Sequence, residues 1–180
     1  MKIARREFGS VAINGGLVAI GGAIDKGTTY TDAVEYLTDI EAGSWIRKGS
    51  MHAKVYTQCV VTVNSTTMLL TGGLEPSQYG KRTWFYDIEK EIITEGPQLM
   101  EKRWSHGCAM LRMGETDAII VAGGYNGSEY FSSVEILDLS KIEKGWREGP
   151  PLSVELSLGY MIGHHNSVYF IGGANNKALK

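Results

Sequence analysis

The chain has 180 residues, 43% of them hydrophobic, and its 18 basic and 20 acidic residues give a formal net charge of −2. This composition fits a folded globular protein and argues against a disordered one. The basic residues are scattered rather than clustered, which argues against nucleic acid or a membrane surface as a partner.

Neither a secretory signal nor a membrane span is predicted. The opening residues 1–7 are charged, and no later apolar run approaches the ~20 residues that a spanning helix needs. A cytoplasmic location is therefore expected. Cys59 and Cys108 lack the spacing of a zinc site, and we expect both to be buried, reduced thiols.

The predicted strands follow one another in four similar groups, in which we name the strands a, b, c and d. In the first group they cover residues 9–13, 17–21, 33–37 and 45–48, and Asn14-Gly15 forms a hairpin turn between a and b. The next two groups repeat this order. The last group supplies only strands a and b, at residues 158–162 and 168–171.

Each strand b ends on a pair of glycines, and the first glycines of successive pairs are 51, 51 and 49 residues apart. Glycine permits a positive φ and the close approach of a neighbouring backbone. A period of about 50 residues is typical of a repeat that folds as one propeller blade. The pairs are Gly21-Gly22, Gly72-Gly73, Gly123-Gly124 and Gly172-Gly173.

A β-rich stretch follows each of the first three pairs, at residues 34–37, 83–87 and 134–138, and Trp45 and Trp146 come after two of them. These phased features resemble the kelch repeat over the whole chain. The resemblance implies an all-β fold of antiparallel four-stranded blades, a kelch β-propeller with about three and a half blades present. It also implies that Trp45 and Trp146 are structural, each packing between blades.

We predict one domain, residues 1–180, because no linker separates the repeats. Half a ring leaves blade faces and strand edges uncovered, so a fragment of a longer propeller is the favoured explanation. The predicted blades cover about residues 3–51, 52–100 and 101–152, with a half blade at 153–180.

The strand order also predicts a binding face. Because antiparallel strands reverse direction, the b–c loops and the connections between blades share one face, and long loops on a rigid scaffold often carry recognition residues. The expected contacts from the b–c loops are Tyr79, Arg82, Asn126 and Tyr130. Phasing against the glycines also places the starts of strand a together, and the resemblance implies that these residues point into a central bowl: Glu7, Tyr56, Ser105 and Glu155.

No catalytic, metal or cofactor site is predicted. The repeats scatter the four histidines, so nothing resembling a catalytic group or a metal ligand set assembles. His106 follows Arg103 by three residues and is expected to form hydrogen bonds near strand a.

The predicted function is binding of a protein or peptide ligand, without catalysis. The kelch resemblance implies substrate recognition in a kelch-like ubiquitin-ligase adaptor or an actin-associated scaffold, and a cullin context only if a BTB domain lies outside this chain. Two glutamates at the predicted bowl suit a basic or neutral ligand. The alternatives are a fragment of a kelch-type propeller enzyme, an oxidase or a sugar-acid isomerase, or a truncated product without independent function.

Overall fold

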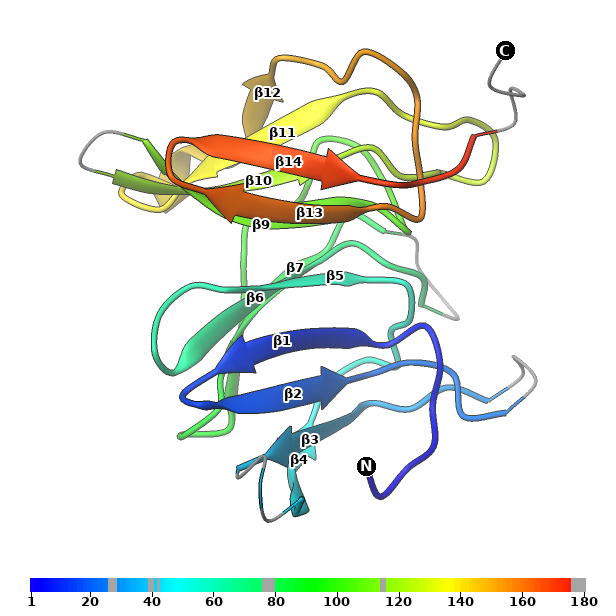
Figure 1. Cartoon of the computed structure of the whole chain (residues 1–180), viewed down its shortest axis with the longest axis vertical. Helices are drawn as coiled ribbons and strands as arrows, with labels where there is room; N and C mark the ends of the chain where they lie inside the picture. Colours follow the sequence, from blue (N-terminus) through cyan, green and yellow to red (C-terminus); the bar gives the residue numbers. More distant parts are fainter. Residues whose placement is uncertain (26–28, 39–40, 42, 76–79, 114–115, 176–180) are drawn as a thin grey trace.

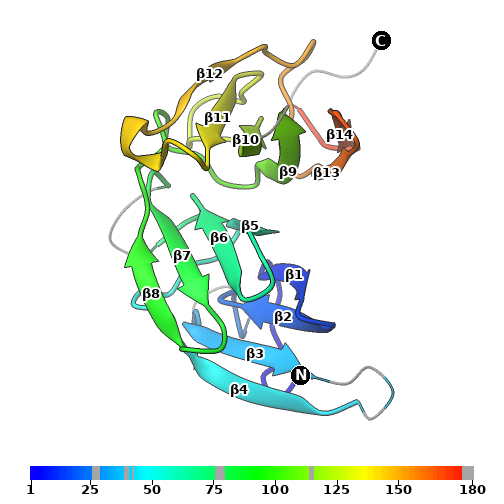
Figure 2. The same ribbon diagram turned by 90° about the vertical axis from the view of Figure 1, so that its left-hand side faces the viewer.

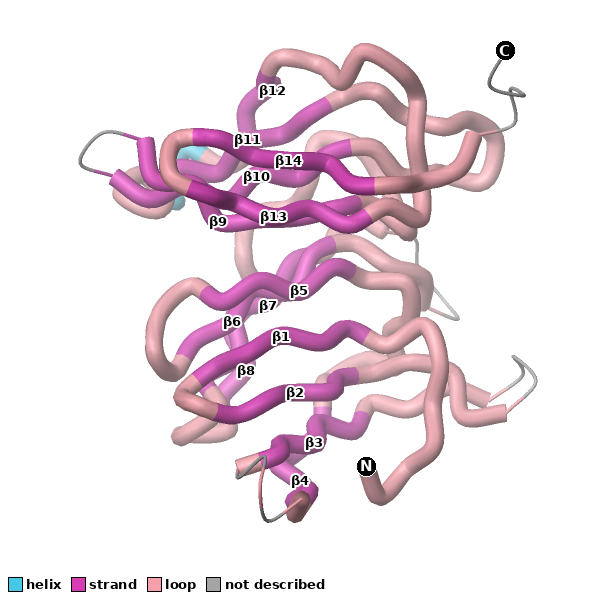
Figure 3. Tube along the Cα trace, in the orientation of Figure 1, coloured by secondary structure: helices cyan, strands magenta, loops and turns pink. Residues whose placement is uncertain are grey.

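The structure, a computed structural model, describes residues 1–25, 29–38, 41, 43–75, 80–113 and 116–175. It holds three four-stranded antiparallel sheets and one two-stranded sheet (Figure 1). Strands and connecting loops alternate along the whole trace (Figure 3), and one 3-10 turn, η1 (Ile142–Lys144), interrupts them. Within the described residues, no helix has the length and apolarity needed to cross a membrane.

Each sheet is one blade, and its strands lie in chain order. Blade 1 contains β1 (Gly9–Ile13), β2 (Gly16–Ile20), β3 (Ala33–Leu37) and β4 (Trp45–Ser50). Blade 2 contains β5 (Cys59–Thr62), β6 (Thr67–Thr71), β7 (Thr83–Asp87) and β8 (Ile92–Glu95). Blade 3 contains β9 (Gly107–Met113), β10 (Thr116–Ala122), β11 (Val134–Asp138) and β12 (Arg147–Gly149). The half blade 4 contains β13 (Tyr160–His164) and β14 (Ser167–Ile171).

The predicted fold class and strand order are confirmed. The blades fan out one after another, with the first strand of each on the inner side and β4, β8 and β12 on the outer side (Figure 2). Asn14 and Gly15, with φ of 49° and 72°, form the two-residue hairpin turn predicted between β1 and β2. The b–c connections leave on the side of both termini, and the a–b turns on the other side (Figure 1).

Three apolar cores lie between successive blades. The first joins β2 and β3 to the facing side of blade 2, where Met68, Leu70 and Trp84 are buried. The second joins Val61 and Leu69 of blade 2 to blade 3, and the third joins blade 3 to β13 and β14. The buried apolar clusters thus lie between neighbouring repeats, whose interfaces contribute to stability as in other repeat proteins.

The glycine pairs are required by the close approach of the next blade. A Cβ on Gly21, Gly72 or Gly123 would lie 2.3–2.4 Å from a backbone carbonyl oxygen of the following blade. In these three pairs the second glycine donates its N–H to that same carbonyl, as Gly22 does to Val55 at 2.8 Å. Gly172 has the same positive φ, 72°, but its Cβ would meet nothing within 4 Å.

Both ends of the fan are uncovered among the described residues. Strand register places Trp45 and Trp146 at equivalent positions, yet only Trp146 is buried, against blade 2, while Trp45 is half-exposed. The predicted packing between blades is thus confirmed for Trp146 but not for Trp45, because no described blade precedes blade 1. On blade 4, the side chains that correspond to buried residues of the other blades are 52% to 79% exposed; these are Tyr160, Ile162, Tyr169 and Ile171.

Candidate functional site

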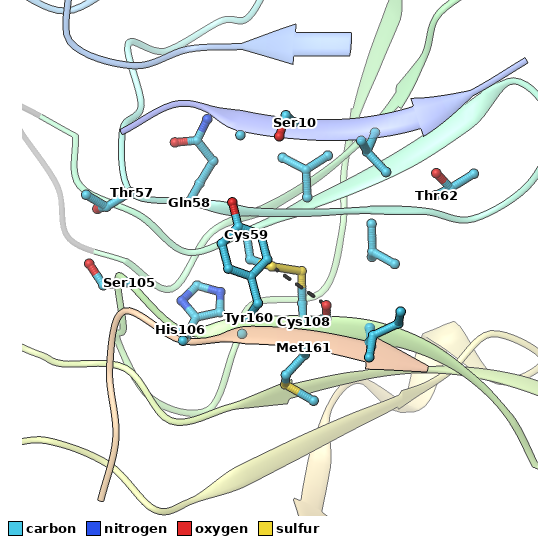
Figure 4. A pocket seen from close by; sticks show the side chains of 18 of the residues that line it. Ser10, Thr57, Gln58, Cys59, Thr62, Ser105, His106, Cys108, Tyr160 and Met161 are labelled. Atoms are coloured by element: carbon cyan, nitrogen blue, oxygen red, sulfur yellow. Dashed lines mark hydrogen bonds between the residues drawn. A yellow bond between two sulfur atoms is a disulfide. The ribbon is translucent and has the colours of Figure 1, made fainter. Parts of the chain in front are cut away.

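The inner strands β1, β5, β9 and β13 border a hollow of about 690 Å³ along the propeller axis (Figure 4). At one end of the hollow, four equivalent non-glycine residues precede these strands, all with φ between 53° and 59°. Their backbones form a chain of hydrogen bonds from blade to blade, 2.7 to 2.9 Å long. The four residues are Glu7, Thr57, Ser105 and Leu158.

This register corrects the predicted bowl positions. Glu7 and Ser105 are equivalent and border the hollow. Tyr56 lies one residue before the equivalent position, which Thr57 occupies, and Glu155 lies three residues before Leu158. Neither Tyr56 nor Glu155 borders the hollow. The lengths of the inner hairpins differ between blades, so counting back from the glycines gave the wrong register.

Gln58 and His106 follow Thr57 and Ser105, immediately precede β5 and β9, and reach back to the preceding blade. Gln58 Nε2 donates a hydrogen bond to the backbone oxygen of Ile20, at 2.8 Å. His106 Nε2 lies 2.8 Å from Thr71 Oγ1, so the predicted hydrogen-bonding role of His106 is confirmed. Within the described structure, Gln58 Oε1 and His106 Nδ1 have no hydrogen-bond partner.

Burial, and secondarily the charge of Arg103, lowers the pKa of His106 from 6.5 to about 3. The folded chain therefore keeps this ring neutral while the unfolded chain takes up a proton near pH 6.5. Stability should be fully present above that pH and should fall as the pH drops toward 3. Between pH 7 and pH 5 we expect a loss of about 2 kcal/mol from this group.

Urea unfolding at the two pH values would measure this loss. The matched variant His106→Gln copies Gln58 of blade 2 and carries no titrating ring. Its stability should depend less on pH than that of the unchanged chain, by the same amount. Equal pH dependence in both proteins would show that His106 is not the responsible group.

Arginine and glutamate form a buried ion pair in blades 1 and 3. Arg103 Nη2 lies 2.8 Å from Glu135 Oε1, and Arg103 also donates to the backbone oxygens of Gly123 and Ser133. Burial lowers the pKa of Arg103, and Glu135 opposes this effect. The equivalent pair in blade 1 joins Arg5 to Glu35 at 2.7 Å.

Blade 2 replaces both members of the pair. Strand register places Trp84 where blades 1 and 3 have glutamate, and Val55 stands in place of the arginine. Both are buried in the core between blades 1 and 2. This exchange was not predicted from the sequence, although Arg5 and Glu35 are 30 residues apart and Arg103 and Glu135 are 32 residues apart.

Half-buried aromatic side chains from three blades gather on the face of the b–c loops. Tyr30 stacks on Tyr56 with ring centroids 4.3 Å apart, joining blades 1 and 2. In blade 3, Tyr125 contacts both Trp104 and Tyr130, at 5.5 and 4.7 Å between centroids. We call this set the aromatic face: Tyr30, Tyr56, Trp104, Tyr125 and Tyr130. Tyr56 and Tyr130 were predicted contacts, whereas the other three were missed because the glycine period does not mark them.

The remaining predicted loop contacts are held by local interactions. Arg82 pairs with Glu75 at 3.5 Å and with Glu95 at 3.3 Å. Burial raises the pKa of Glu75, and Arg82 lowers it in part. Asn126 Oδ1 accepts hydrogen bonds from the backbone of its own turn, at residues 128 and 129. Tyr79 lies outside the described residues.

The expectation of two reduced thiols is wrong. Cys59 and Cys108 form a disulfide with their Cα atoms 5.9 Å apart. Cys59 is equivalent to Gly107, so the two cysteines are offset by one residue. Because side chains alternate between the faces of a strand, Cys59 points toward blade 3 and Cys108 toward blade 2, and they meet in the core between these blades.

In the part of the chain that the structure describes, no group of three or more His, Cys, Asp or Glu residues could hold a metal ion. His164 and His165 are neighbours in the β13–β14 hairpin, with their rings 4.0 Å apart. They lie on the side opposite the aromatic face, because a–b turns and b–c loops are at opposite ends of the strands.

Comparison with known proteins agrees with this geometry. The Kelch motif matches residues 116–153, from β10 to the segment after β12. The chain therefore contains a kelch motif and has the fold of part of a β-propeller. The solved structure of YjhT superposes with a TM-score of 0.76 at 14% sequence identity, over 94% of this chain. No curated protein matches the sequence.

The chain spans 59% of the length of YjhT. At this identity the likeness concerns the fold, which here is a partial propeller.

Proposed function

We propose that this partial kelch propeller binds a protein or peptide through its aromatic face. The observation that carries the proposal is the gathering of five half-buried aromatic side chains from three blades beside the b–c loops. Tyrosine and tryptophan are frequent anchors of interfaces because they offer a large contact area with few rotatable bonds. The rigid blades hold these rings in place, so little ordering is required on binding.

Peptides selected from a display library against the purified chain would test this proposal. The variants Tyr56→Ala and Trp104→Ala should each weaken the binding of a selected peptide about tenfold or more, since such anchors dominate interfaces. Isothermal titration calorimetry would measure the dissociation constants, and circular dichroism would show that each variant folds.

The controls lie on the opposite face. Asn64→Lys, in the β5–β6 turn, and His165→Ala, in the β13–β14 turn, should leave binding within about twofold, as expected for residues outside an interface. Similar losses in both sets of variants would contradict the face assignment. Failure to select any peptide would contradict the proposal itself.

The finer predictions are tied to the kelch resemblance. A role in a ubiquitin-ligase adaptor or an actin-associated scaffold stays a prediction, as do the contacts of Glu155 and the absence of catalysis. The cytoplasmic location also stays a prediction, and the disulfide weighs against it because such bonds persist mainly in oxidising compartments.

A further inference from the structure

The unpaired acceptors of Gln58 and His106 point to a ligand in the hollow. Both side chains are more than nine-tenths buried, with 7% and 5% of their surfaces exposed, and both border the hollow. A buried polar atom without a partner is costly, and native proteins seldom keep one without a water, an ion or a ligand beside it. Here two such atoms occur at equivalent positions of neighbouring blades.

Both unpaired atoms are acceptors. Gln58 uses its amide nitrogen to bind Ile20, which leaves Oε1 facing away from that bond. His106 Nε2 faces Thr71 Oγ1 at 2.8 Å, much as the Gln58 amide nitrogen faces the backbone oxygen of Ile20. We assign the proton of the neutral ring to Nε2, where it is donated to that hydroxyl, and in this tautomer Nδ1 is an acceptor. A ligand for this pair must therefore donate two hydrogen bonds.

The charges around the hollow favour a positive ligand. None of the described residues that line it is lysine or arginine, and the carboxylate of Glu7 lies at the same end. Glu7 pairs with Arg6 at 2.9 Å in an exposed contact, and Arg103, whose charge acts on His106, is itself paired with Glu135 at 2.8 Å. Gln58, His106, Thr57 and Ser105 all lie at this one end of the hollow (Figure 4).

We propose that Gln58 Oε1 and His106 Nδ1 accept hydrogen bonds from a guanidinium group that enters this end of the hollow. A guanidinium offers several N–H donors in one plane and is weakly hydrated, which suits a partly enclosed site. The natural source is an arginine side chain of the protein or peptide partner. That source rests on the proposed function, whereas the site itself does not.

Titration of the unchanged protein with small probes would test the site directly. Nα-acetyl-argininamide should shift the ¹⁵N NMR signal of His106 Nδ1 in a saturable manner. Nα-acetyl-citrullinamide, which has nearly the same shape without the charge, should bind at least about tenfold more weakly, as expected for loss of a charged hydrogen bond. This experiment needs no variant to fold.

Three variants refine the test, and isothermal titration calorimetry would measure probe binding in each. Gln58→Lys keeps a donor for Ile20 but removes the acceptor, and it should weaken binding of the arginine probe about tenfold or more. Thr62→Lys adds the same charge at the other end of the hollow (Figure 4) and should change binding no more than about twofold. His106→Gln supplies the same donor and acceptor as Gln58 and should retain binding.

Distinct outcomes would overturn the proposal. If neither probe shifts the His106 signal, the two acceptors bind only water. Equal binding of both probes would make the site one for neutral donors and would refute the guanidinium assignment. Equal losses in Gln58→Lys and Thr62→Lys would show a general charge effect. Each of these results is independent of whether peptides bind the aromatic face.

Discussion

Replacing Arg103 with leucine should destabilise the chain by about 3–5 kcal/mol, the usual cost of leaving a buried charge without its partner. Glu135 would keep its contacts with the backbone of Met100 and Glu101 but would lose the guanidinium of Arg103, which lies 2.8 Å away. The backbone oxygens of Gly123 and Ser133 would also lose a donor. Urea unfolding followed by tryptophan fluorescence would measure the change in free energy.

The chain supplies a matched control for this variant. Arg112 pairs with Asp117 at 3.3 Å, but its side chain is 73% exposed. Arg112→Leu should therefore cost no more than about 1 kcal/mol. The double variant Arg103→Val with Glu135→Trp copies blade 2 and should lose less than the two single variants together, because no buried charge remains. Equal losses for Arg103→Leu and Arg112→Leu would contradict this account.

Removing the disulfide should be about equally costly. The bond closes a loop between residues 49 positions apart, and the chain-entropy relation gives a stabilisation of about 4 kcal/mol for a loop of this length. The double variant Cys59→Ser with Cys108→Ser should unfold at a correspondingly lower urea concentration. Mass spectrometry of the intact chain before and after reduction would establish that the bond is present.

Treatment with a reductant distinguishes the effect of the disulfide from the effect of replacing two cysteine side chains. It should lower the stability of the unchanged protein toward that of the double variant, and it should leave the double variant unaffected. If the reduced and oxidised proteins unfold at the same urea concentration, the disulfide adds no stability.

The blades could be predicted from the sequence because their signal is repetition. A glycine pair is needed wherever a blade carbonyl approaches the end of strand b, as Val55 approaches Gly21. That demand recurs once per blade, so the period is visible without any knowledge of contacts. The hairpin at Asn14-Gly15 was equally local, since its turn type depends on two adjacent residues.

The site could be predicted only in part because it depends on register. β1, β5 and β9 begin 12, 13 and 16 residues before the first glycine of their pairs, so counting back from the glycines does not reach equivalent residues. An error of one residue reverses the face to which a side chain points. Such an error placed Tyr56 at the hollow. It also concealed that Cys59 and Cys108 point toward each other.

The burial of individual side chains shows the role of residues that the sequence pattern did not single out. Trp84 was not separated from other aromatic residues by its spacing, yet it is buried at the position where two other blades hold a charged glutamate. Gln58 and His106 are different residue types, so their equivalence became visible only when both were seen to bond to the preceding blade.

The uncovered face of blade 4 also bears on how the chain fluctuates. In an array where each repeat is stabilised mainly by its neighbours, a terminal repeat with one interface opens more often than an internal one. Among the described residues, blade 4 has two strands and packs on blade 3, while Tyr160 and Ile171 are exposed. Its backbone amides should exchange with deuterium soonest, and those of blades 2 and 3, bonded through Cys59 and Cys108, should exchange last.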